Sequence, residues 1–210
     1  MVFYFMKSQD VLLLFKLVCL HKREQEHFNN APRAWPLDWQ DWEEESGFIG
    51  AYSESPIYTA RALEEVTGIS KSQVNLSIRR CLDVGLIRFD RNLGTPRVNR
   101  RALFEFVVYG LKYVFPAKPA EITRGIATAF AAPVLNEVLI SGGELVPVWP
   151  YAQGHTKGQA VEPIYKSVVF AVRKDPELYA MLALVDAIRI GMPREVSLAK
   201  DILKQHLEVG

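Results

Sequence analysis

Apolar residues recur at helical spacing over most of the chain. The run at residues 11–20 is apolar nearly all round, yet it is short and contains Lys16, so it predicts a buried helix rather than a membrane span. Two amphipathic segments follow later, with apolar stripes at positions 60, 63 and 66 and at positions 74, 78, 81 and 82. We therefore expect a chain built mainly from helices.

A glycine separates the two amphipathic helices. Gly68 enters a left-handed backbone conformation without steric cost, and Ile69 can fill the corner between two helices. Ser70 then begins the next helix, and with Gln73 three residues on it predicts a capping box. The pattern indicates a helix-turn-helix.

The second helix of this pair carries no carboxylate on its predicted outer face. The side chains expected there all form hydrogen bonds: Lys71, Ser72, Gln73, Asn75, Ser77, Arg79 and Arg80. Such side chains bond phosphate oxygens or base edges in a DNA major groove. Residues 86–89 alternate as a short strand, and residues 90–96 have the composition of a hairpin tip. Arg91 and Arg97 flank that tip, where they are expected to contact the DNA backbone or minor groove.

The local charge favours the same region. Residues 70–101 contain eight Lys and Arg against two Asp, an excess of six positive charges in a chain whose net charge is +1. Charge this concentrated is typical of a phosphate-binding surface. Two other interpretations stay open: the basic face is only a solvated surface, or the module docks a protein.

The stretch GISKSQVNLSIRRCLDVGLIRFD resembles prokaryotic winged-helix transcriptional regulators, in particular MarR-like ones. The resemblance lies in the N-terminal half. It implies that residues 70–82 form the recognition helix and residues 91–97 the wing. Because one fold serves many functions, the function it implies is an expectation: a sequence-specific DNA-binding regulator, a repressor that acts by occupying an operator.

An acidic, tryptophan-rich insertion at residues 29–56 precedes the helix pair. Trp35, Trp39 and Trp42 alternate there with carboxylates, and no Lys or Arg occurs from residue 34 to residue 60. Exposed tryptophans could bind a partner protein, or the segment could cover the recognition helix as a mimic of DNA. A third interpretation is that the tryptophans pack on the domain and leave an acidic rim in solvent.

The second half of the chain has fewer signals. Asn99 is expected to cap a helix that runs toward Val114 and needs cover on more than one side. Prolines and glycines then mark an irregular region, in which residues 121–132 predict a short Ala-rich helix. Asp175 and Pro176 begin a strong helix, and a partner helix after Pro193 completes a hairpin. The hairpin could serve as a dimer arm or as a partner-binding surface, and the default expectation is that it covers the Asn99 helix.

We therefore predict a mainly α fold with a small β-wing. A winged helix-turn-helix DNA-binding domain at residues 6–114, with the insertion at residues 29–56, precedes an irregular helical C-terminal region at residues 115–210 for dimerisation, partner or ligand binding. Cys19 and Cys81 fall on apolar stripes and suggest no disulfide framework or metal site, which favours the cytoplasm. The expected partners are double-stranded DNA and a second copy of the chain. No membrane, metal or cofactor is expected.

Catalysis is not expected. His155 and Glu162 lie in a Gly-containing loop, but no nucleophile motif, phosphate loop or metal pair accompanies them. The alternative function is that of an antitoxin or adaptor, which neutralises or docks a partner protein and autoregulates its operon. The acidic tryptophan-rich insertion favours that alternative.

Overall fold

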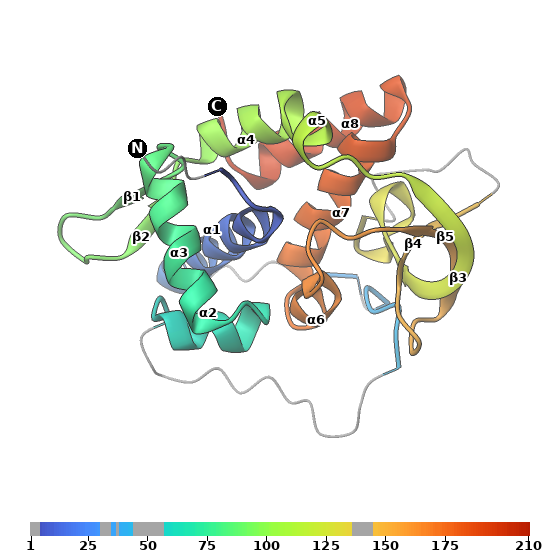
Figure 1. Ribbon diagram of the computed structural model, residues 1–210, viewed down its shortest axis with the longest axis horizontal. Coiled ribbons are helices and arrows are strands. Elements are labelled where there is room, and N and C mark those ends of the chain that lie inside the picture. The colour runs from blue at the N-terminus through green and yellow to red at the C-terminus, as the bar shows by residue number, and fades with distance from the viewer. Residues whose placement is uncertain (1–4, 30–34, 37, 44–56, 136–144) are drawn as a thin grey trace.

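The computed structural model describes residues 5–29, 35–36, 38–43, 57–135 and 145–210. Over these residues the protein is mainly helical with a small mixed sheet region, which confirms the predicted class at that level (Figure 1). The elements of the first half are α1 (Ser8–Asn29), α2 (Ala60–Thr67), α3 (Lys71–Asp83), β1 (Ile87–Phe89), β2 (Pro96–Val98), α4 (Arg100–Tyr109) and α5 (Leu111–Val114). Those of the second half are β3 (Pro119–Ala127), η1 (Ala129–Ala131), η2 (Pro133–Leu135), β4 (Pro147–Pro150), β5 (Thr156–Val161), α6 (Val168–Val172), α7 (Pro176–Ile190) and α8 (Pro193–His206).

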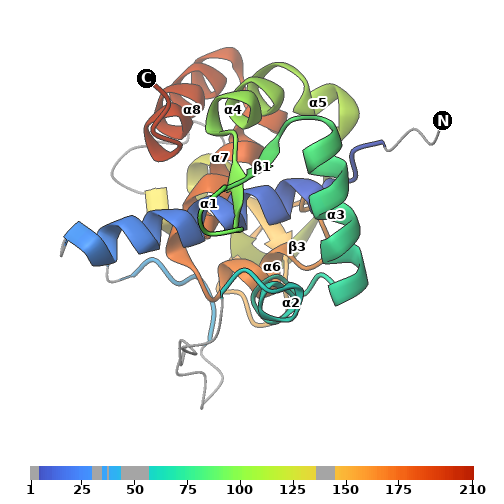
Figure 2. The same cartoon turned by 90° about the vertical axis from the view of Figure 1, so that its left-hand side faces the viewer.

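Helix α1 runs through the middle of the molecule (Figures 1 and 2). Every residue from position 11 to position 20 is buried, as the apolar run predicts. The helix contacts α2, α3 and β2 from the first half and α7 from the second. The helix begins at Ser8, and the Asp10 carboxylate in its first turn accepts a 2.8 Å hydrogen bond from the Lys7 amide.

The corner between α2 and α3 has the predicted geometry. Gly68 has a φ of 67°, and Ile69 is fully buried between the helices. Thr59 caps α2 by accepting a hydrogen bond from the Ala62 amide. The predicted capping box of α3 is wrong, because the Ser70 side chain makes no cap hydrogen bond and Gln73 accepts one from Gln9 of α1.

A two-stranded antiparallel hairpin follows α3 at the predicted place. β1 and β2 pair with Arg88 opposite Arg97 and Phe89 opposite Pro96. Asn99 then caps α4 by accepting a hydrogen bond from the Ala102 amide, as expected. The predicted continuous helix is interrupted at Gly110, where α4 ends and the short α5 begins.

The helix predicted at residues 121–132 is wrong. Most of that segment is strand β3, which pairs antiparallel with both β4 and β5, while β4 and β5 pair in parallel. Alanine content favours a helix only weakly, and pairing with two strands overrides it. Gly125 permits the close approach of β4, because a Cβ atom there would lie 2.1 Å from the Trp149 carbonyl oxygen.

The predicted C-terminal helical hairpin is confirmed. Asp175 caps α7, Pro176 is its first residue, and residues 177–188 are all buried. Both α7 and α8 contact α4, so the hairpin covers the Asn99 helix as expected. A buried ion pair of 2.7 Å between Lys16 of α1 and Asp175 joins the two halves. One apolar core continues across them, and the proposed division into two domains stays a prediction.

Candidate nucleic-acid interface

The outer face of α3 presents four of the predicted side chains to solvent. Lys71, Ser72, Asn75 and Arg79 are all exposed. No carboxylate occurs between position 71 and Arg79, because the first acid of the helix is Asp83 at its last position. The exposed strip therefore carries cations and hydrogen-bonding groups.

Two residues predicted on this face, Ser77 and Arg80, are buried instead. The Arg80 guanidinium forms two hydrogen bonds with the Asp10 carboxylate, and it also donates a 2.9 Å hydrogen bond to the Ser77 hydroxyl. Gln9 donates a second hydrogen bond to that hydroxyl. Hydrogen bonding with Asp10 raises the pKa of Arg80. Both residues face α1 because the helical period turns them away from solvent, so neither can contact DNA.

Gln73 lies at the edge of the face. It is half-buried, and its side-chain oxygen accepts a 3.0 Å hydrogen bond from Gln9. That bond engages the same side chain that the sequence assigns to base contact. Gln73 therefore helps to hold α3 against α1, and its side-chain oxygen is already engaged there rather than free for a base.

The two hairpin arginines predicted to contact DNA differ in exposure. Arg91 is exposed near the tip, but the Arg97 side chain is only 13% exposed. Arg97 forms a 2.8 Å ion pair with Glu24 of α1 and lies over the Tyr58 ring. Burial and the hydrogen bond with Glu24 raise the pKa of the Tyr58 hydroxyl. The prediction that Arg97 contacts DNA is wrong for this arrangement, since its charge is neutralised against α1.

Arg88 is a further candidate, which was not among the residues predicted to contact DNA. It is exposed on β1, directly opposite Arg97 in the register. Alternation along the strand would have placed it outward, because its neighbour Ile87 is buried. Of the eight Lys and Arg in residues 70–101, the four that make no ion pair among the described residues are thus Lys71, Arg79, Arg88 and Arg91.

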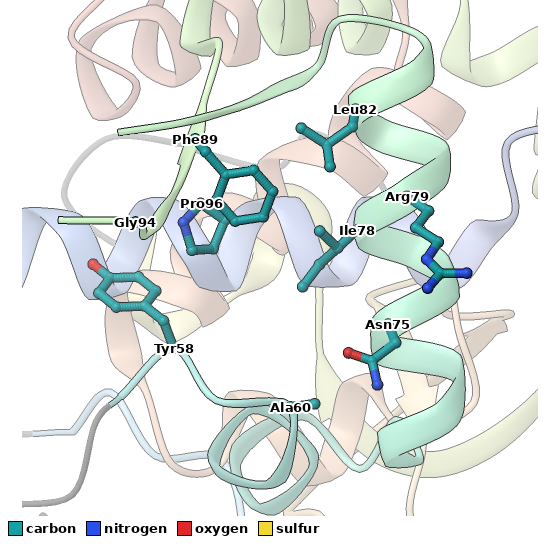
Figure 3. A pocket seen from close by; sticks show the side chains of 9 residues that line it. All are labelled: Tyr58, Ala60, Asn75, Ile78, Arg79, Leu82, Phe89, Gly94 and Pro96. Atoms are coloured by element: carbon teal, nitrogen blue, oxygen red, sulfur yellow. The ribbon is translucent and has the colours of Figure 1, made fainter. Parts of the chain in front are cut away.

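A groove of about 580 Å³ lies between α3 and the hairpin (Figure 3). Ile78 and Leu82 point from α3 toward Phe89 and Pro96 of the hairpin, and Tyr58 lies at the lower edge. Asn75 and Arg79 line the groove beside this apolar floor. Residues of α3 and of the hairpin therefore line the same groove.

Two residues from the second half of the chain bond the end of α2, next to the corner between α2 and α3. Ser167 donates a 2.6 Å hydrogen bond to the Thr67 carbonyl, and Lys174 donates one of 2.8 Å to the Glu65 carbonyl. Both carbonyls belong to the last turn of α2, where backbone acceptors lack helical partners. The orientation of α2 therefore depends on α6 and on the start of α7.

The tryptophans predicted to bind a partner point into the molecule. Trp42 is 4% exposed, and its ring lies 5.3 Å from that of Trp39 in an edge-to-face contact. Both rings also contact Tyr179 of α7, and Trp35 packs half-buried against the same core. Trp42 is therefore not presented to a partner, and Trp35 and Trp39, which are half-buried, pack against the same core as in the third interpretation. Residues 30–34, 37 and 44–56 of the insertion lie outside the described part.

The polar loop of the second half shows no assembled catalytic group. His155 and Glu162 are both exposed, and no hydrogen bond joins them among the described residues. The described residues contain no group of three or more His, Cys, Asp or Glu side chains that could hold a metal ion. None of the helices among the described residues, in either half, is long and apolar enough to cross a membrane.

Comparisons of this chain with protein-family models, with curated proteins and with solved structures found no match.

Proposed function

We propose that this protein is a winged-helix DNA-binding regulator of the prokaryotic type, a repressor that acts as a homodimer. The observation that carries the proposal is that residues of α3 and of the β1–β2 hairpin line one groove (Figure 3). Figure 2 shows the two elements on the same side of the molecule. Four cations of α3 and the hairpin, Lys71, Arg79, Arg88 and Arg91, make no ion pair among the described residues. A surface with unpaired cations and few carboxylates favours a polyanion.

Helix α3 would enter the major groove. A groove about 12 Å wide admits one helix, and the exposed side chains along α3 have the chemistry for base edges. Arg79 can bond guanine and Asn75 can bond adenine, each with two hydrogen bonds, while Ser72 accepts or donates to either. Each good two-bond contact contributes about 1–3 kcal/mol of discrimination.

The hairpin would lie over the adjacent minor groove. Arg91 near the tip and Arg88 on β1 are both exposed, so both are available for phosphates that border the groove. The sugar-phosphate strand between the two grooves would then pass along the groove between α3 and the hairpin. The apolar side chains of its floor, Ile78, Leu82 and Phe89, could pack against the carbon atoms of deoxyribose.

The two ion pairs with α1 support the proposal because they fix the elements that would contact DNA, although Arg80 and Arg97 do not contact DNA themselves. Arg80 with Asp10 fixes α3 to α1, and Arg97 with Glu24 fixes the hairpin to α1. The distance between the two DNA-contacting elements is therefore set before DNA binds. Preorganisation of this kind lowers the entropic cost of binding.

The homodimer and the steric mechanism belong to the proposal. One helix and one hairpin contact few base pairs, and a two-fold pair doubles the site and matches a palindrome. Occupancy of an operator then blocks transcription without catalysis.

The proposal is tested with DNA from upstream of the protein's own gene. Arg79→Ala should weaken binding, while Arg194→Ala removes the same charge from the exposed start of α8 and should leave binding unchanged. Equal affinities of the parent and Arg79→Ala would contradict the assignment of α3 as the DNA-contacting helix.

The alternative, an antitoxin or adaptor, keeps one supporting observation. Tyr109 and Tyr113 of α4 and α5 are 69% and 74% exposed, and tyrosine is common at the centre of protein interfaces. Co-purification with the product of a neighbouring gene, lost in a Tyr109→Ala, Tyr113→Ala variant, would favour it. A homodimer that retains no partner would count against it.

A further inference from the structure

The tip of the β1–β2 hairpin is a rigid turn. The Asp90 carboxylate accepts hydrogen bonds of 2.8 and 3.0 Å from the Asn92 and Leu93 amides. The Gly94 amide donates to the Asp90 carbonyl, and the Asp90 amide donates to the Thr95 carbonyl. Gly94 has a φ of 62°, a conformation that glycine adopts without strain. These hydrogen bonds, together with the left-handed conformation of Gly94, fix the backbone of the tip.

The base of the hairpin is fixed as well. Arg97 of β2 is held by Glu24 of α1 at 2.8 Å, and the Asn99 amide donates to the Leu86 carbonyl. The hairpin protrudes from the body of the molecule (Figure 1). A side chain at its end consequently has a defined position relative to α3.

Leu93 occupies that end, and the residue is 65% exposed. It lies between Asn92 and Gly94 and two residues from the exposed cation Arg91. Phe89, the other exposed apolar residue of the hairpin, lies across the groove from Leu82 of α3 and is not at the tip (Figure 3). An apolar side chain held rigidly at the end of a basic hairpin has nothing in the described part of the chain to bury it.

We propose that Leu93 enters the DNA minor groove as an apolar wedge, partly unstacks one base step and bends the duplex. The inference rests on the proposed function, and it adds an activity, DNA bending, to it. Proteins that bind the minor groove insert side chains such as leucine between base steps and bend the duplex by about 20–90°. Arg91 beside it supplies attraction to the phosphates that border the groove.

The chemistry of the wedge also selects the DNA step. Pyrimidine–purine steps such as TA and CA unstack most easily, so the site under the hairpin tip is such a step. This preference arises from deformability rather than from a hydrogen bond to a base. Changing that step to a stiff A-tract therefore weakens binding although Leu93 makes no polar contact there.

The experiment uses the full-length protein and a duplex that it recovers from a random pool. The duplex carries a donor and an acceptor dye at its ends, and a second version has 2-aminopurine in the step under the tip. Binding of the parent should bring the ends closer and raise the 2-aminopurine fluorescence, because the base becomes unstacked. Leu93→Ala should bind within about tenfold of the parent and lose both signals, whereas Leu93→Phe should retain them.

A matched variant separates the wedge from simple attraction. Arg91→Ala should weaken binding and reduce its salt dependence, yet the duplex that remains bound should be bent as before. A straight duplex with the parent, or an equal bend with Leu93→Ala, overturns the inference while salt-dependent binding leaves the proposed function intact. Failure of the parent to bind any duplex at low salt overturns both.

Discussion

The Arg80 guanidinium of α3 holds the Asp10 carboxylate of α1 through two hydrogen bonds, from Nε at 2.8 Å and from Nη2 at 2.5 Å. The side chains are 4% and 0% exposed. A charge that the sequence assigns to DNA is therefore used inside the protein. The pair sets the orientation of α3, on which the exposed cations depend.

Asp10→Ala should lower the free energy of unfolding by about 3–5 kcal/mol, because the Arg80 charge stays buried without its partner. Urea unfolding followed by circular dichroism measures the change. The double variant Asp10→Leu, Arg80→Met removes both charges and should recover most of the loss. A single variant as stable as the parent would show that α3 does not depend on this pair.

Glu177 should make stability depend on pH in the acid range. Burial raises the pKa of its carboxyl, but hydrogen bonding and charge from His206 and Lys22 outweigh burial and bring the pKa from 4.5 to about 2. Because the pKa falls on folding, the carboxylate stabilises the fold fully above its unfolded pKa, and this contribution is lost as the pH drops toward 2. The contribution is on the order of 3 kcal/mol.

The comparison with Glu177→Gln isolates this carboxylate. The variant should be less stable than the parent at neutral pH, and its stability should fall less steeply between about pH 5 and 2. Denaturant unfolding at a series of pH values measures both curves. Parallel curves over that range would contradict the role of Glu177.

Gly68 and Gly85 give a matched pair of substitutions at the two ends of α3. Both have a positive φ, 67° and 74°, so alanine costs about 1–2 kcal/mol of backbone strain at either. At Gly68 the added Cβ would also lie 3.0 Å from Ser167 and 3.1 Å from Phe170, whereas at Gly85 it meets open space. Gly68→Ala should therefore be the more destabilising in thermal unfolding. Equal losses would show that α6 does not press on the corner.

Trp42→Ala should destabilise the fold by about 3–5 kcal/mol, the usual loss for a large buried aromatic side chain. Its contacts with Trp39 and Tyr179 would be replaced by a cavity. The control Tyr113→Ala removes a ring that is 74% exposed and should change stability by about 0.5 kcal/mol or less. A stable Trp42→Ala variant would contradict the packed arrangement of the insertion's tryptophans.

Local signals predicted the elements whose causes lie within a few residues. The left-handed Gly68, the Asn99 cap and the pair Asp175 and Pro176 each fix a helix end through adjacent backbone groups, and all three are found where expected. The nearly continuous apolar run of α1, interrupted only by Lys16, likewise implied burial on every side. These features needed no knowledge of distant parts of the chain.

Most of the wrong predictions depend on a distant partner. Ser77 and Arg80 are buried because Asp10 lies across from them, and Gln73 leaves its capping role because Gln9 is within reach. The segment at residues 121–132 becomes a strand because β4 and β5 pair with it. Spacing along the sequence contains no signal for these partners, so the surface charge was overestimated.

The salt dependence of DNA affinity measures whether the four exposed cations contact phosphates. With four available cations a copy, Lys71, Arg79, Arg88 and Arg91, the logarithm of affinity should fall against the logarithm of salt with a slope of about −7 for a two-fold pair and about −4 for a single copy. Arg79→Ala should make the slope shallower, and Arg194→Ala should leave it unchanged. An affinity that does not change with salt, or an Arg79→Ala slope equal to that of the parent, would contradict the account.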